Sequence, residues 1–179
     1  MHAALSLHPA NQAPAVTGVE VEVERRAGGV LALRYRLAGA IGDLVIPQAS
    51  TSARTDDLWR RTCFEAFVRA GAGPGYCELN FSPSSQWAAY RFTGERTGMA
   101  PAEIPTVAVA AASTGQTLEL SATIDLSRAL PAGGPWRLGL SAVVEAADGT
   151  LSYWALTHRS AQPDFHHPES FVLELAEPA

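Results

Sequence analysis

Two glutamates, an asparagine and an arginine have the spacing to share one face of a β-hairpin. Residues 58–92 read as two strands joined by a glycine-rich turn. Because side chains alternate along a strand, Glu65 shares a side with Arg61, and Glu78 shares a side with Asn80. Closing the turn predicts that Glu65 lies directly opposite Glu78. Carboxylate, amide and guanidinium groups on one face have the chemistry to bind the hydroxyl groups of a polar ligand.

Like charges directly opposite each other destabilise a hairpin, so the two glutamates require an explanation. A ligand-binding face is one explanation. The other is an ordinary polar surface in which Arg61 and Arg91 neutralise the pair, because antiparallel sheets often expose one face to water. The other side of the hairpin, with Phe64 opposite Leu79, is predicted to face the core.

Tryptophans near this hairpin could add an aromatic surface for a flat ligand. Trp59 has the same parity as Arg61, and Trp87 follows the turn after the second strand. Both are therefore candidates for stacking, although core packing is the alternative for each. Trp136 begins an apolar strand and is predicted to be buried in the core.

A second segment, residues 153–171, is rich in histidine, acidic and aromatic side chains. We expect a strand at 151–156, followed by an ordered loop at the edge of the polar face. His158, Asp164 and His166 would then form the rim of a pocket, a structural hydrogen-bonding loop or a metal site. We assign no metal, because adjacent histidines in an extended chain point apart and no recognised ligand spacing is present.

Signals of catalysis are weak. The sequence has no nucleophile elbow and no phosphate-binding loop. Paired carboxylates are used in glycoside hydrolysis, and opposed strand positions about 5 Å apart would suit only a retaining mechanism. Hydrolysis by Glu65 and Glu78 is thus an alternative, and we assign no catalytic residue.

The elements that must position these groups are predicted to be strands. Strict alternation, as in residues 19–24 and 118–124, marks half-buried strands, and turn signals recur at short spacing. The pattern predicts an all-β antiparallel sandwich of about ten strands. We expect one domain over residues 16–176, with residues 1–15 as a loose segment.

Composition excludes some classes of protein. A net charge of −5 and a pI near 5.5 argue against nucleic acid as a partner, because phosphate binding needs a basic patch. No stretch of eighteen apolar residues and no signal peptide is evident, so we expect a cytoplasmic protein with no membrane segment. Cys63 and Cys77 fall on opposite faces of the hairpin and are expected to stay reduced. All thirteen basic residues are arginine, which is typical of a GC-rich bacterial genome.

Three motifs resemble bacterial DOMON-like proteins, which are related to family 9 carbohydrate-binding modules: LW..TCFEAF from Leu58, Y.ELN.SPS..WAAYRF from Tyr76 and YWAL.H....PDFHHP.SF from Tyr153. The resemblance covers residues 18–175. It implies an immunoglobulin-like β-sandwich of ten or eleven strands with a ligand cleft on one sheet. It also implies that Glu65, Glu78 and Asn80 occupy positions that bind sugar hydroxyls.

The resemblance leaves two ligand classes open. A small sugar bound without catalysis is the leading hypothesis, with Arg61, Glu65, Glu78, Asn80, Trp59, Trp87, Arg91, His158, Asp164 and His166 as candidate site residues. Haem is the alternative, since some DOMON domains bind it through a methionine and a histidine. Here Met99 with His158, or with the His166–His167 pair, would supply those ligands. A protein partner that uses an exposed edge strand is a third possibility.

Overall fold

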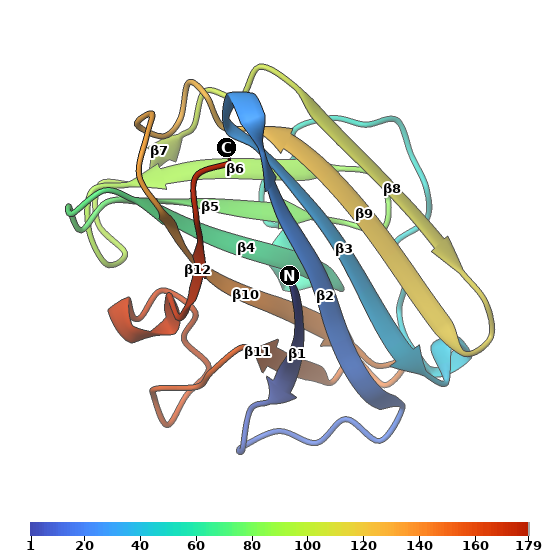
Figure 1. Ribbon diagram of the computed structural model, residues 1–179. Helices are drawn as coiled ribbons and strands as arrows, with labels where there is room; N and C mark the ends of the chain where they lie inside the picture. The colour runs from blue at the N-terminus through green and yellow to red at the C-terminus, as the bar shows by residue number, and fades with distance from the viewer. Residues whose placement is uncertain (179) are drawn as a thin grey trace.

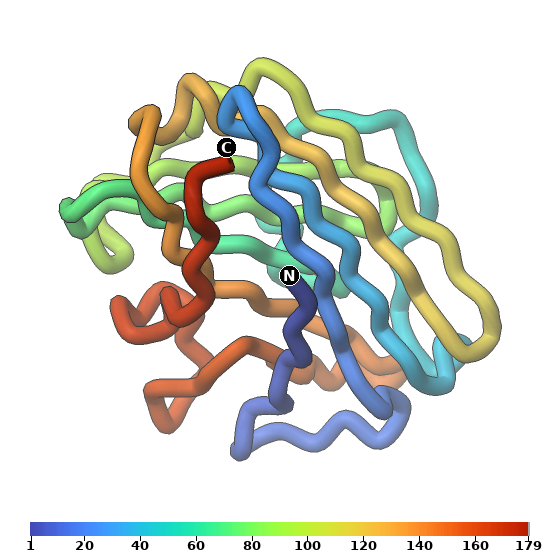
Figure 2. Tube along the Cα trace, in the orientation of Figure 1, coloured from blue at the N-terminus to red at the C-terminus, as the bar shows by residue number. Residues whose placement is uncertain are grey.

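Two antiparallel β-sheets pack face to face (Figures 1 and 2) in the computed structural model, which describes residues 1–178. The front sheet of Figure 1 runs β8 (Val107–Ser113), β9 (Thr117–Asp125), β3 (Val30–Gly39), β2 (Val16–Arg26) and β1 (His2–Leu7). The back sheet runs β7 (Ala100–Pro101), β6 (Trp87–Phe92), β5 (Tyr76–Phe81), β4 (Cys63–Ala70), β10 (Trp136–Glu145) and β11 (Leu151–Ala155). The short strand β12 (Leu173–Leu175) pairs with the start of β10. The predicted antiparallel sandwich is therefore confirmed, with twelve strands in the described residues.

Strand β1 joins the two sheets into one curled sheet. Its first residues pair with β2, and Ser6 and Leu7 pair with β11 of the back sheet. We expected residues 1–15 to be loose, and the structure differs. Leu5 is buried between the sheets, and this burial offsets the entropy lost on ordering the segment.

The core lies between the sheets and follows the alternation of the sequence. In β2, valines at 19, 21 and 23 point inward, and the intervening glutamates point to solvent. From the back sheet, Phe64 and Leu79 point into the same core, as predicted. Tyr35 of β3 is fully buried, and its hydroxyl group donates to the backbone oxygen of Glu65 at 2.7 Å. The core therefore contacts the strand that carries the candidate site.

The register of the central hairpin differs from the prediction by two residues. Glu65 pairs with Asn80, and Glu78 pairs with Phe67, so the two glutamates are diagonal neighbours. β4 ends at Ala70 and β5 begins at Tyr76, with Val68 and Cys77 as the last pair before the turn. Turn length sets the register, and a shift of two residues leaves every side chain on its predicted face.

Regular helix is limited, in residues 1–178, to four short 3-10 turns: η1 (Ala27–Gly29), η2 (Ile41–Asp43), η3 (Leu58–Arg60) and η4 (Pro168–Ser170). None of these is long or apolar enough to span a membrane.

Candidate ligand-binding site

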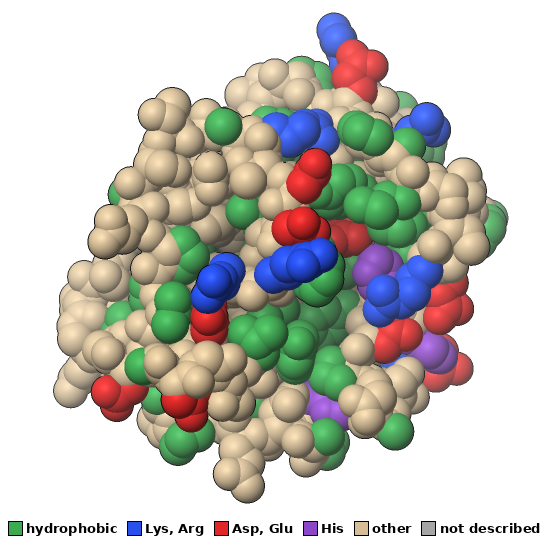
Figure 3. Space-filling view, turned by 180° about the vertical axis from the view of Figure 1, so that it is seen from behind, with side chains coloured by type: hydrophobic (Ala, Val, Ile, Leu, Met, Phe, Trp, Pro, Cys, Tyr) green, Lys and Arg blue, Asp and Glu red, His purple; other side chains and the backbone are tan. Residues whose placement is uncertain are grey.

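The candidate site lies on the outer face of the back sheet. Glu65 of β4, Glu78 and Asn80 of β5 and Ser141 of β10 project from this face, which we call the polar face. Figure 3, which views the molecule from behind, shows a hollow with a hydrophobic floor and with acidic, basic and histidine side chains around it. The structure thus brings Glu65, Glu78 and Asn80 together, as the alternation predicted.

The two carboxyl groups are buried and hydrogen-bonded within the face. Glu65 and Glu78 are only 3% and 6% exposed. Asn80 Nδ2 donates to Glu78 Oε1 at 2.8 Å, and the Ser141 hydroxyl group donates to Glu65 Oε2 at 3.2 Å. These bonds hold the two carboxyl groups in fixed positions.

Burial changes the protonation of this pair. Desolvation, and then the nearby charge of Glu78, raise the pKa of Glu65 to about 8. Desolvation also raises the pKa of Glu78, although the hydrogen bond from Asn80 opposes this change. Near neutral pH the Glu65 carboxyl group is therefore mainly protonated, so it can donate a hydrogen bond as well as accept one.

Aromatic rings border the carboxyl groups. Phe67, Tyr76, Tyr90, Phe92 and Phe171 form a hydrophobic cluster separate from the main core. The rings of Tyr76 and Phe92 are stacked with centroids 4.8 Å apart. The apolar surface of the hollow therefore lies directly beside its hydrogen-bonding groups, a combination typical of small-molecule sites.

Residues 157–171, the covering segment (orange to red in Figure 2), close part of this face. His166 Nε2 lies 3.7 Å from Glu78 Oε2, and His166 Nδ1 lies 2.7 Å from the Tyr76 hydroxyl oxygen. That hydroxyl oxygen accepts from the Arg96 backbone N–H at 3.3 Å, so its own proton is free to point at Nδ1. Desolvation and then the charge of Arg96 lower the pKa of His166 to about 4. The ring is therefore neutral, with Nε2–H facing Glu78.

Asp164 ties the covering segment to the turn after β6. Its Oδ1 atom accepts from Arg96 Nη2 at 2.7 Å and from the His166 backbone N–H at 3.0 Å. Burial alone would raise the pKa of Asp164, but these hydrogen bonds and the charge of Arg96 outweigh it, so the pKa is lowered. Asp164 and His166 thus lie at the rim of the site, as the loop hypothesis expected.

The two arginines expected to neutralise the glutamates do not do so. Arg61 instead donates to Glu145 Oε1 at 2.6 Å, at the far end of β10. Arg91 pairs with Cys77 and projects from the side of β6 opposite to that of Glu78, where it is exposed to solvent. The cation that acts on both carboxyl groups is Arg96, whose charge favours their ionised forms.

The two candidate tryptophans have different positions. Trp87 is on the core side of β6, where the Arg54 guanidinium lies 4.7 Å from its ring centroid, so its proposed place beside the polar face is wrong. Trp59 belongs to η3 and is 47% exposed. Its neighbour Leu58 packs on the aromatic cluster, so Trp59 stands at the border of the site.

His158 lies away from the carboxyl groups. Its Nε2 atom is 2.8 Å from the Ser6 backbone oxygen, and its ring packs edge-on against His8 of the N-terminal segment. It therefore anchors the start of the covering segment to β1 and is not part of the polar face. Met99, the other residue considered for haem, is 58% exposed in a surface loop.

Several residues of the site were not identified from the sequence. Ser141 carried a signal, because Gly139, Ser141 and Glu145 interrupt one side of an otherwise apolar strand. Tyr76 carried the alternation signal, because it has the parity of Glu78, but its contact with His166 was not predicted. Arg96 carried no signal, because its bond to Asp164 joins segments that are distant in sequence. Among residues 1–178, no three His, Cys, Asp or Glu side chains are placed to hold a metal ion.

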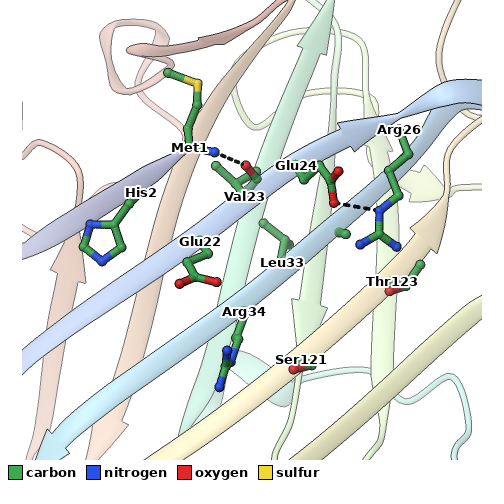
Figure 4. Close-up of a pocket in the computed structure, with 11 residues that line it drawn as sticks. Met1, His2, Glu22, Val23, Glu24, Arg26, Leu33, Arg34, Ser121 and Thr123 are labelled. Atoms are coloured by element: carbon green, nitrogen blue, oxygen red, sulfur yellow. Dashed lines mark hydrogen bonds and ion pairs between the residues drawn. The ribbon is translucent and has the colours of Figure 1, made fainter. Parts of the chain in front are cut away.

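Another hollow, of about 600 Å³, lies on the outer face of the front sheet (Figure 4). Its charged side chains lie along β2 and β3 and are largely paired on the exposed surface. Arg26 Nε is 2.7 Å from Glu24 Oε2, and Arg34 Nη2 is 2.9 Å from Glu119 Oε2. Exposed pairs of this kind are typical of a solvated sheet face, so the polar face of the back sheet is the better candidate.

Comparisons with known proteins show that the fold is similar to that of other solved β-sandwiches. A candidate carbohydrate-binding protein from Bacteroides uniformis superposes with a TM-score of 0.74 at 16% identity, over 98% of this chain and 85% of the other. Two structures of a family 9 carbohydrate-binding module from Caldicellulosiruptor kristjanssonii each superpose with a TM-score of 0.57. The complex with glucose has 10% identity and covers 96% of this chain and 82% of the other. The complex with cellotriose has 11% identity and covers 96% of this chain and 80% of the other. No protein-family model and no curated protein sequence matches the chain.

Proposed function

We propose that this protein binds a small sugar, without catalysis, on the polar face of the back sheet. The observation that carries the proposal is the pair of buried carboxyl groups, Glu65 and Glu78, held beside an amide and an aromatic cluster. The likeness of the fold to modules that bind glucose and cellotriose supports the same class of ligand.

Each group in the hollow has a use in sugar recognition. Glu78 and Asn80 would accept and donate hydrogen bonds to hydroxyl groups, and a protonated Glu65 adds a further donor. The aromatic cluster, or Trp59 at its border, would stack on the C–H face of the sugar ring. Hydrogen-bonded carboxyl groups beside rings are therefore complementary to the two faces of a pyranose.

Binding requires movement of the covering segment. Glu65, Glu78 and Asn80 are almost completely buried, so a ligand cannot reach them while His166 and Phe171 remain in place. The segment contains little regular structure beyond η4 and is attached through side-chain contacts such as Arg96–Asp164 and Tyr76–His166, which makes it the element best suited to move.

We favour binding over hydrolysis because of the protonation of the pair. A retaining glycosidase needs one ionised carboxylate as the nucleophile beside a protonated acid. Here burial raises the pKa of both Glu65 and Glu78, which disfavours an ionised nucleophile, and the Glu78 carboxyl group already accepts a hydrogen bond from Asn80.

Thermal shift and calorimetric titration with glucose, cellobiose, cellotriose and other small sugars test the proposal. We expect one class of sugar to raise the melting temperature and to bind with a Kd of about 1 mM or tighter. Glu78→Gln should abolish this binding, and Glu119→Gln on the front sheet is the matched control. The absence of any shift over the whole panel would contradict sugar binding.

Haem remains the second ligand to test, and an absorption spectrum after incubation with hemin distinguishes the two. A Soret band that shifts on His166→Ala would support haem in place of a sugar.

We also propose, from the three sequence motifs, that the chain is a bacterial DOMON-like domain of immunoglobulin-like topology. A reducing cytoplasmic location is supported by two buried free thiols, Cys63 and Cys77, and burial raises the pKa of Cys77 to about 11.

A further inference from the structure

A further cavity, of about 380 Å³, lies at the end of the sandwich between the two sheets. Its walls come from the turn between β2 and β3, from the loop between β9 and β10, and from the C-terminal residues up to Pro178. Figure 1 shows the C-terminus next to that turn. The cavity lies on the core side of β10, whereas the polar face lies on its outer side, so the two sites are separate.

Arg25 is the principal charged group of this cavity. It is the last core-facing residue of β2, and its guanidinium carbon lies 4.1 Å from the ring centroid of Trp136 on the opposite sheet. Its Nη1 atom donates to the Gly134 backbone oxygen at 2.6 Å. Within residues 1–178 it forms no ion pair with a carboxylate, unlike its neighbour Arg26, which pairs with Glu24.

Two buried N–H donors at the cavity have no acceptor in the described part of the chain. They are Arg25 Nε and the indole Nε1 of Trp136, a residue that is only 2% exposed. Buried donors without an acceptor are rare and costly in folded proteins. A guanidinium without a carboxylate partner, with its own Nε–H free and a free indole N–H beside it, is complementary to an oxyanion.

The backbone also leaves room for a ligand. Gly28 and Gly29 line the cavity with φ angles of 74° and 79°, a left-handed conformation that favours glycine; a Cβ atom at Gly28 would meet nothing within 4 Å, whereas one at Gly29 would meet Ser127. Glu177 is the acidic residue at the opposite rim, where its Oε2 atom accepts from the Gly134 backbone N–H at 3.0 Å. The negative charge of Glu177 would therefore weaken the binding of an anion in the cavity.

We propose that this cavity is a second binding site, for a small molecule that carries a carboxylate or phosphate group. The guanidinium of Arg25 would hold the oxyanion, and the Trp136 indole N–H would donate to it after a small movement of the ring. The volume of the cavity suits a ligand of the size of a small organic acid or a phosphorylated metabolite.

Titration with inorganic phosphate and, separately, with succinate tests this site, with the indole N–H signals followed by NMR. We expect a saturable shift of one indole signal, identified by its absence in Trp136→Phe, with a Kd of about 1 mM. The ligand that binds more tightly identifies whether phosphate or carboxylate chemistry is recognised. No saturable shift with either ligand would overturn the proposal.

Three variants separate this site from a general effect of charge. Arg25→Gln should weaken binding at least about tenfold, because the charged donor is lost. Glu177→Gln should tighten binding about twofold to threefold by removing repulsion. Arg36→Gln, on the exposed face of the front sheet, removes the same charge and should change nothing. If Arg25→Gln does not fold, Arg25→Lys replaces it and should bind the anion more weakly than the wild type. The proposal would be contradicted if Arg25→Lys and Glu177→Gln both bound the anion with the affinity of the wild type.

Discussion

At the scale of single residues, the polar face is unusual because its carboxyl groups are buried with mostly neutral partners. Glu65 is bonded to a serine and Glu78 to an asparagine, and the nearby His166 is neutral. Arg96 supplies the positive charge, and its guanidinium is bonded to Asp164. Desolvation therefore raises the pKa of both carboxyl groups, and Glu65 in particular is not ionised at neutral pH.

A first prediction concerns replacement of both glutamates. Glu65→Gln with Glu78→Gln should leave the free energy of unfolding within about 1 kcal/mol of the wild type, because glutamine mimics a protonated carboxyl group and relieves repulsion. Sugar binding should be lost. Urea denaturation and calorimetry measure the two effects. A collapse of folding would instead show that the carboxylates are required in their ionised form by the structure.

A second prediction concerns pH. The pKa of Glu65 is about 8 in the folded protein and 4.5 when unperturbed, so the folded state binds more protons between these values. This contribution to stability is complete below pH 4.5 and is lost as the pH rises to 8. His166, with a pKa lowered from 6.5 to about 4, acts in the opposite sense: its contribution is present above pH 6.5 and is lost as the pH falls to 4.

The two effects oppose each other below pH 6.5, so the clearest signal lies above it. We expect the free energy of unfolding to fall by about 1–2 kcal/mol between pH 6.5 and 8. Denaturation series at several pH values measure this slope. Glu65→Gln should remove most of it, and His166→Gln should preserve it. An unchanged slope in Glu65→Gln would assign the titration to another group.

At the scale of elements, the strands and the covering segment were not equally predictable. Alternation placed Glu65, Glu78 and Asn80 on one face correctly, because the face of a strand depends only on parity. Register depends on turn geometry, which gave the wrong partner for Glu65. The relation of β6 to β5 depends on a second turn, so Trp87 was placed on the wrong face. The covering segment has no periodicity, and its contact with Arg96 depends on tertiary packing.

A third prediction concerns the hydrogen bond between Arg96 and Asp164, which attaches the covering segment to the turn after β6. Arg96→Gln removes the 2.7 Å bond to Asp164. Because Arg96 is largely exposed, we expect global stability to fall by less than about 1 kcal/mol. Amide hydrogen exchange in residues 161–167 should become faster. Arg128→Gln, which breaks the exposed pair with Glu103, is the control and should leave this exchange unchanged. Equal exchange in both variants would show that the segment is held elsewhere.

At the scale of the whole molecule, β1 links the two sheets along one edge. Leu5 is 5% exposed and belongs to the main core. Leu5→Ala should lower the free energy of unfolding by about 2–4 kcal/mol through the cavity it leaves. Ala4→Ser, at an exposed position of the same strand, should have little effect. Urea denaturation of both variants measures the difference, and a small effect of Leu5→Ala would mean that β1 contributes little to joining the sheets.

The covering segment also determines how fast a ligand can enter. If residues 157–171 must leave the face before a sugar binds, opening is a separate step with its own rate. In stopped-flow mixing, the observed rate should then level off at high sugar concentration, at the value set by opening. Arg96→Gln, by loosening the segment, should raise that plateau. A closed face thus makes the speed of recognition a property of the protein rather than of the concentration of its ligand.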